Sequence, residues 1–189
     1  GFVAEWKDLP KQIKQAFNEC FYLTEEGYLA DYVDLRGADK AVRCNQIIAC
    51  GLPYTMLDEE QIVNIMLISR QHLLTPHGLR SLSPEDSRFE STYKENPIEQ
   101  EAASKNGAVW VWPLMFYAKT CFAIGGERFL PDAEELLAGF DEEIQTSCIG
   151  SVSECFEGDP PFKAHGCLSQ ATSVGGLLYI SMLADQWRK

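Results

Sequence analysis

The alternation of two kinds of helical segment constrains this chain more than any other feature of its sequence. Three segments carry apolar residues on one helical face and polar residues on the other; they are 9–20, 58–73 and 132–144. Three others carry apolar residues on more than one face; they are 40–50, 112–124 and 169–187. Such an alternation is typical of outer helices that cover an inner layer. It predicts an all-α fold of about three outer/inner helix pairs.

Residues at the starts of these segments support their assignment as helices. Asp8 stands where an N-cap is expected, and Pro10 fits the first turn of the helix. Asp58, followed three residues later by Gln61, predicts a capping box. Pro113 is expected in the first turn of the apolar segment 112–124.

The connections between the segments are unequal in length. The links from an outer to an inner helix, 21–39, 75–106 and 146–168, are long, whereas the reverse links are short. The first is expected to contain a short hairpin or an extended excursion around Gly27, and the second is expected to be irregular. All three long links should gather at one end of the helices, where a functional site is expected.

Composition bounds the classes of partner and compartment. The 189 residues predict a single helical domain, residues 1–189, with 46% hydrophobic residues and a formal net charge of -12. This acidic balance disfavours nucleic-acid binding, because phosphate backbones are repelled. No apolar run reaches membrane-spanning length, so we expect no membrane partner and a cytoplasmic location. The first residue is Gly rather than Met, so a chain that begins further upstream is expected.

The seven cysteines and three histidines predict no metal site. The cysteine number is odd, no C-x-x-C pair occurs, and His72, His77 and His165 are dispersed. We expect thiols that are neutral or buried. Nucleotide-binding glycine patterns and nucleophile-elbow motifs are also missing from the sequence, so no cofactor is predicted.

The long connections contain polar and aromatic residues of two possible uses. Arg43, Asn45 and Gln46, at the start of an inner helix, can hydrogen-bond sugar hydroxyls or cap loop carbonyls. Trp110 and Trp112 can offer flat faces to sugar rings or belong to the core.

The third long connection carries two acidic candidates. Glu154 can activate water as a general base or be an ordinary solvated carboxylate. Asp159, which precedes Pro160, can orient its loop or contact a substrate.

Four stretches taken together resemble the C-terminal, amylo-1,6-glucosidase domain of glycogen debranching enzymes. They are RCNQIIACGLPYTMLDEEQ (43–61), LLTPHGLRSLSPED (73–86), NGAVWVWP (106–113) and SVSECFEGDPPFKAHGCLSQATSV (151–174). The resemblance implies an (α/α)6 toroid that removes single α-1,6-linked glucose stubs from a glycogen limit dextrin with inversion. Three helix pairs would form the second half of such a ring.

The same resemblance implies roles for individual residues. Glu154 matches the general base, and the partner acid would lie on an N-terminal half that these 189 residues do not include. Gln170 belongs to the matching last block and is a substrate-binding candidate together with the residues above. A half ring would expose apolar helix edges, so self-association or pairing with that N-terminal half is expected.

Four positions depart from the family pattern and keep a rival interpretation open. Ser104 and Lys105 stand where members usually carry Tyr-His, His165 where an Arg is common, and Thr172 where a Trp often follows Gln-Ala. Fewer sugar-stacking groups would weaken substrate binding. The alternative is a non-catalytic glucan-binding or helical interaction module that retains the scaffold.

Overall fold

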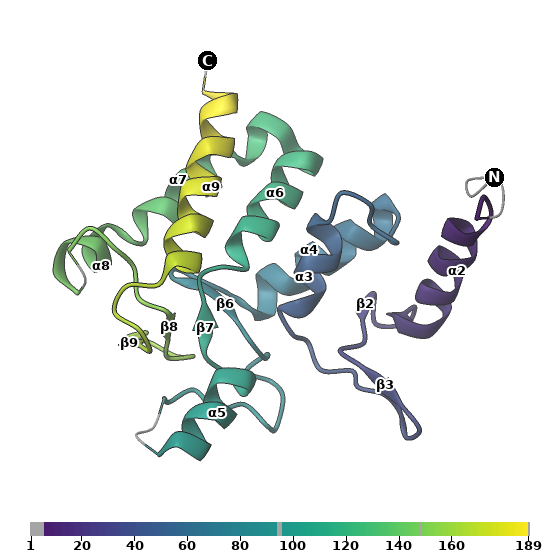
Figure 1. Cartoon of the computed structure of the whole chain (residues 1–189), viewed down its shortest axis with the longest axis horizontal. Coiled ribbons are helices and arrows are strands. Elements are labelled where there is room, and N and C mark those ends of the chain that lie inside the picture. Colours follow the sequence, from purple (N-terminus) through teal and green to yellow (C-terminus); the bar gives the residue numbers. More distant parts are fainter. Residues whose placement is uncertain (1–5, 94–95, 148, 189) are drawn as a thin grey trace.

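The computed structural model describes residues 6–93, 96–147 and 149–188, which form a mainly helical chain (Figure 1). The helices are α2 (Leu9–Phe21), α3 (Asn45–Gly51), α4 (Glu59–His72), α5 (Pro97–Asn106), α6 (Leu114–Gly125), α7 (Leu130–Ala138), α8 (Asp141–Thr146) and α9 (Ala171–Trp187), with a 3-10 turn, η1 (Gly126–Phe129), between α6 and α7. No described helix is long and apolar enough to cross a membrane.

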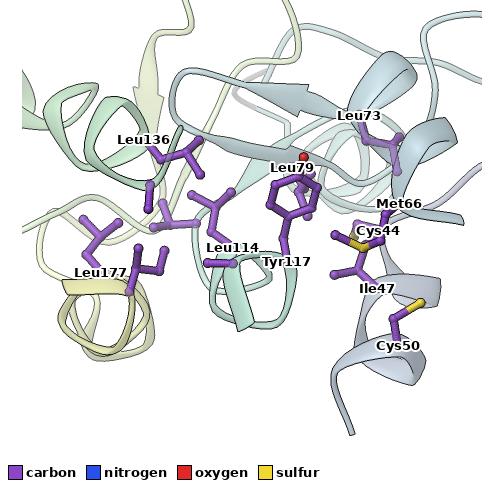
Figure 2. Packing of buried hydrophobic residues seen from close by; sticks show 14 of the residues in the cluster. Cys44, Ile47, Cys50, Met66, Leu73, Leu79, Leu114, Tyr117, Leu136 and Leu177 are labelled. Carbon is purple, nitrogen blue, oxygen red and sulfur yellow. The ribbon is translucent and has the colours of Figure 1, made fainter. Parts of the chain in front are cut away.

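Helix α6 lies at the centre of the inner layer. It packs against α3 on one side and α9 on the other (Figure 1), and five of its residues are buried. Figure 2 shows Leu114 and Tyr117 of α6 between Leu177 of α9 and Ile47 of α3. Burying each such side chain stabilises the fold by about 1.5–3 kcal/mol. The expected inner layer is therefore α3, α6 and α9.

Helices α4 and α7 lie outside this row. Helix α4 packs against α3 and α6, and α7 packs against α9. The predicted capping box is confirmed at the start of α4: the Gln61 N–H donates to Asp58 Oδ1 at 2.9 Å, and the Asp58 N–H donates to Gln61 Oε1 at 3.0 Å. At α2, which is described in full, Asp8 occupies the N-cap position but its side chain makes no capping bond.

The three long connections gather at one end of the helices, which is the lower end in Figure 1. The first contains two antiparallel hairpins, β1 (Tyr22–Leu23) with β2 (Tyr28–Leu29), the hairpin expected around Gly27, and β3 (Val33–Asp34) with β4 (Gly37–Ala38). The other two build an antiparallel five-stranded sheet in chain order; its strands are β5 (Leu74–Thr75), β6 (Gly78–Arg80), β7 (Val109–Trp110), β8 (Cys155–Phe156) and β9 (Ala164–His165).

The all-α prediction missed this sheet, and the expectation of an irregular 75–106 segment was wrong in part. Strands of two or three residues are too short to reveal the alternation by which a strand is recognised. Helix α5 begins at Pro97 and is capped by Asn96, whose side chain accepts a hydrogen bond from the Ile98 N–H. Only Ala103 is buried in α5, so this helix has no apolar stripe that a sequence pattern could reveal.

Two predicted helix boundaries were also wrong. The segment 40–50 becomes helical only at Asn45, because the carbonyl of Val42 accepts a hydrogen bond from the Ser83 N–H instead of a helical donor. The segment 132–144 forms two helices, α7 and α8, that are separated at Gly139 and Phe140. Phe140 is fully buried, and Gly139 lies close against the backbone of Pro76.

The close approach at Gly139 generates a prediction about stability. A Cβ at Gly139 would lie 2.5 Å from the carbonyl oxygen of Pro76, which is backbone and cannot rotate away. We expect G139A to lower the free energy of unfolding by about 1–3 kcal/mol. At Gly175, inside α9, a Cβ would meet no atom within 4 Å. G175A should therefore raise the free energy of unfolding by about 0.5–1 kcal/mol, because alanine is the better helix former. Urea unfolding of both variants measures the difference, and equal effects would contradict the steric explanation.

Candidate functional site

One cavity brings together four of the residues singled out from the sequence. Arg43, Asn45, Trp110 and Trp112 line a cavity of about 550 Å³ at the end where the long connections gather. Asn45 lies at the start of inner helix α3, and the two tryptophans lie in and just after β7, immediately before inner helix α6. The remaining described lining residues are Asp31, Cys44, Ser81, Ser104, Lys105 and Asn106.

Arg43 ties three segments together at the edge of this cavity. Its Nη1 donates to the carbonyl of Lys105 at 2.5 Å, and its Nη2 donates to Asn106 Oδ1 at 2.9 Å. Its Nε lies 3.2 Å from Asp31 Oδ2, and the other carboxylate oxygen of Asp31, Oδ1, accepts a hydrogen bond from the Asn45 amide at 2.9 Å. Arg43 thus caps a carbonyl in the last turn of helix α5, rather than the loop carbonyl that was one of its two predicted partners, and it also fixes the cavity wall.

Both tryptophans are half-buried, so neither is a full member of the core. The Trp110 indole N–H donates to the carbonyl of Ser104 at 3.0 Å. Trp112 packs edge-on against Phe116 of α6, with ring centroids 6.4 Å apart. The polar atom of Trp110 is therefore paired within the protein, and both side chains contribute to the surface of the cavity.

Three predicted substrate residues do not line this cavity. Gln46 is buried, where its amide donates to the Arg43 carbonyl at 3.1 Å. Asp159 is exposed and lies 3.9 Å from the guanidinium of Arg80. Gln170 is at the N-cap position of α9, and its backbone N–H donates to the carbonyl of Val152 at 3.0 Å.

Glu154 is half-buried and lies immediately before β8. Its Oε2 accepts a hydrogen bond from the Cys167 N–H at 2.9 Å, and its own N–H donates to the Cys167 carbonyl at 2.9 Å. A Cβ at Gly166 would lie 2.6 Å from the same Oε2 and 2.8 Å from the Glu154 Cβ, and the φ of +75° at Gly166 also disfavours a side chain, so this position favours glycine. Glu154 is not among the described residues that line the tryptophan-containing cavity.

A buried carboxylate supports the segment beneath Glu154. Glu143 of α8 is only 6% exposed, and its Oε1 accepts hydrogen bonds from the Ser153 hydroxyl at 2.5 Å and from the Ser153 N–H at 3.3 Å. Sequence reasoning missed Glu143, although a signal exists. It lies three residues after Phe140 and next to Ile144, on the apolar stripe of the expected helix, where an unpaired carboxylate would be costly.

The thiols near this segment are neutral. Burial raises the pKa of Cys155 to about 12, and a hydrogen bond to Glu154 raises the pKa of the exposed Cys167. Six cysteines are free in the described chain, whereas Cys148 lies outside the described residues. Within the described ranges, no group of three or more His, Cys, Asp or Glu residues is arranged to hold a metal ion.

A comparison with solved structures supports this helical architecture, whereas a comparison with curated proteins adds nothing to it. The search of curated proteins finds no match. Among solved structures, a neutral trehalase from Saccharomyces cerevisiae is similar over 97% of this chain, with a TM-score of 0.63 and 14% sequence identity. The chain spans about a third of that trehalase, 33% of its length. This likeness concerns the fold, and it confirms the predicted class, a partial (α/α)6 toroid with paired helices.

The family model described as amylo-alpha-1,6-glucosidase matches residues 3–179. This range contains all four stretches that carry the sequence resemblance, together with both tryptophans and Glu154. The chain therefore belongs to the amylo-alpha-1,6-glucosidase family.

Proposed function

We propose that the chain is the C-terminal half of a larger (α/α)6 glycosidase domain, in a glycogen debranching enzyme that hydrolyses α-1,6-linked glucose at branch stubs. The observation that carries the proposal is the single cavity lined by Arg43, Asn45, Trp110 and Trp112, within a range matched by the family model. Sugar-binding sites combine aromatic faces with hydrogen-bonding groups in this way.

In this proposal Glu154 is the general base of an inverting reaction. It removes a proton from a water molecule as the water attacks the anomeric carbon, while a second carboxyl group protonates the departing oxygen. An inverting pair is about 6.5–9.5 Å apart, which leaves room for the water. We assign the acid to an N-terminal half outside these residues. The Cys167 N–H orients the base, and Glu143 supports it through Ser153.

The remaining predicted residues bind the glucan or support the surface that binds it. The faces of Trp110 and Trp112 pack against sugar rings, and Asn45 hydrogen-bonds hydroxyl groups, with Arg43 fixing the wall. Gln46 supports this wall from below through the Arg43 carbonyl.

Asp159 and Gln170 contact substrate outside the cavity. Gln170 suits this role because its backbone is bonded to Val152, two residues before Glu154. Asp159 suits it because it is exposed and lies in the same long connection as Glu154.

The partner implied by the proposal is an α-glucan, such as a glycogen limit dextrin. The net charge of -12 is unfavourable for nucleic acid. The six free thiols agree with a reducing compartment, and we place the protein in the cytoplasm.

Replacing the base tests the mechanism. We expect E154Q to lower glucose release from a limit dextrin by the natural protein about 10²–10⁴-fold, because the amide cannot accept the proton of water. Affinity for the dextrin should stay within about twofold. Glucose release and dextrin binding, measured on the same preparation, check both statements.

The matched control is E142Q, which changes an exposed glutamate of α8 and should leave turnover unaltered. Unchanged glucose release in E154Q would refute Glu154 as the base. Saturable dextrin binding by a natural protein that releases no glucose would instead favour the glucan-binding module without catalysis.

The outward face of α9 predicts self-association of the 189-residue chain. Leu178 and Met182 are one helical turn apart and are 61% and 62% exposed. We propose that the N-terminal half covers this face in the natural protein and that a second copy covers it in the isolated chain. The sedimentation coefficient should rise with concentration, and the L178E/M182E variant should remain monomeric.

The control for this experiment is I98E, at an exposed isoleucine of α5. This variant should self-associate like the parent chain, because Ile98 lies on a different helix. A parent chain that stays monomeric at high concentration would contradict the assignment of the α9 face.

A further inference from the structure

A second cavity, of about 620 Å³, lies beside the segment that holds Glu154. It is separate from the tryptophan-containing cavity, and none of the residues that the structure describes lines both. Its described lining residues come from three places, the part of the second long connection just before α5, helix α5 itself and the β8–β9 hairpin with the residue after it; they are Thr92, Tyr93, Gln100, Glu157, Lys163, His165 and Gly166.

The register of the sheet places the two cavities on the same side. Trp110 of β7 pairs with Cys155 of β8, and Cys155 pairs in turn with His165 of β9. Directly opposed residues of antiparallel strands point to the same face of a sheet. Trp110, in the first cavity, and His165, in the second, therefore share a face and are separated by two strand spacings, roughly 10 Å.

Helix α5 connects the same two places. Gln100, in its first half, lines the second cavity, and Ser104 and Lys105, near its end, line the first. The two cavities thus follow one helix along one face of one sheet.

The lining of the second cavity suits a neutral ligand rich in hydroxyl groups. The Tyr93 ring stacks on His165 with centroids 4.9 Å apart, and His165 Nε2 lies 3.2 Å from Glu157 Oε1. Burial raises the pKa of Tyr93, so its hydroxyl keeps its proton at neutral pH. Among the described lining residues, Glu157 and Lys163 carry opposite charges, which does not select an anion. Hydroxyl, amide, carboxylate and ammonium groups together donate and accept hydrogen bonds, as sugars require.

Gly166 links this cavity to Glu154. It lines the cavity, and a Cβ there would meet Glu154 Oε2 at 2.6 Å. Its φ of +75° also disfavours a side chain. Gly166 therefore lies between the second cavity and Glu154, which is not itself among the described lining residues.

We infer that the second cavity is a glucan subsite, which binds the α-1,4-linked chain that carries the branch stub. The inference rests on the proposed function for its substrate class. Tyr93 and His165 are the residues that form the subsite, and the chain it holds continues along α5 toward Trp110.

Calorimetric titration of the E154Q chain with maltoheptaose and with maltose tests this subsite without requiring hydrolysis. We expect maltoheptaose to bind at least tenfold more tightly than maltose, because it reaches both cavities. Y93A and H165A, each combined with E154Q, should lose most of this difference, and Y93F should keep part of the stacking and an intermediate affinity. Y54A, which changes a tyrosine that is 87% exposed, is the matched control and should bind like the parent.

Circular dichroism and urea midpoints show whether each variant is folded. Folded Y93A and H165A variants that bind maltoheptaose as the parent does would overturn the subsite, as would saturable binding of inorganic phosphate without binding of maltoheptaose. These results are independent of the glucose-release assay. If E154Q abolishes release and the subsite variants bind normally, only the subsite fails; if they lose binding while E154Q still releases glucose, only the assignment of the base fails.

Discussion

The packing of α6 between α3 and α9 is the interaction on which the rest of the structure depends. Because α6 is apolar on several sides, it can bury residues against both neighbours at once, and it fixes the spacing of the inner row. Trp110 and Trp112 immediately precede α6, and Asn45 begins α3. The same contacts that form the core therefore set how far apart the walls of the tryptophan-containing cavity stand.

The short five-stranded sheet fixes the long connections relative to one another. Its strands come from both the second and the third long connections, so segments far apart in the sequence become neighbours. Glu154, Trp110 and His165 owe their relative placement to this sheet rather than to any helix. Glu143 adds a buried anchor on the other side of the segment, through Ser153. The candidate site is thus built on loops, but each loop is tied down at several points.

Periodicity predicted the helices well because each buries a face whose spacing is visible in the sequence. It failed where the stabilising partners are distant: the two-residue strands are stabilised by neighbours such as Val109 and Phe156, and Phe140 leaves the helix to enter the core. Four of the seven predicted substrate residues share a cavity, but Gln46 turned out buried. Whether a residue at the start of α3 is buried or lines the cavity depends on which side of that helix faces the core. The sequence Arg-Cys-Asn-Gln alone does not show this orientation.

Helix α2 differs from the other long helices that the structure describes, because none of its thirteen residues is fully buried. Its side chains make few of the contacts that resist local opening, so the helix can fray without disturbing the inner row. Its amide hydrogens should accordingly exchange with solvent far sooner than those of α6. If the helices closed into a complete ring, α2 would gain packing partners. Slower exchange of its amide hydrogens would then report that the ring has closed.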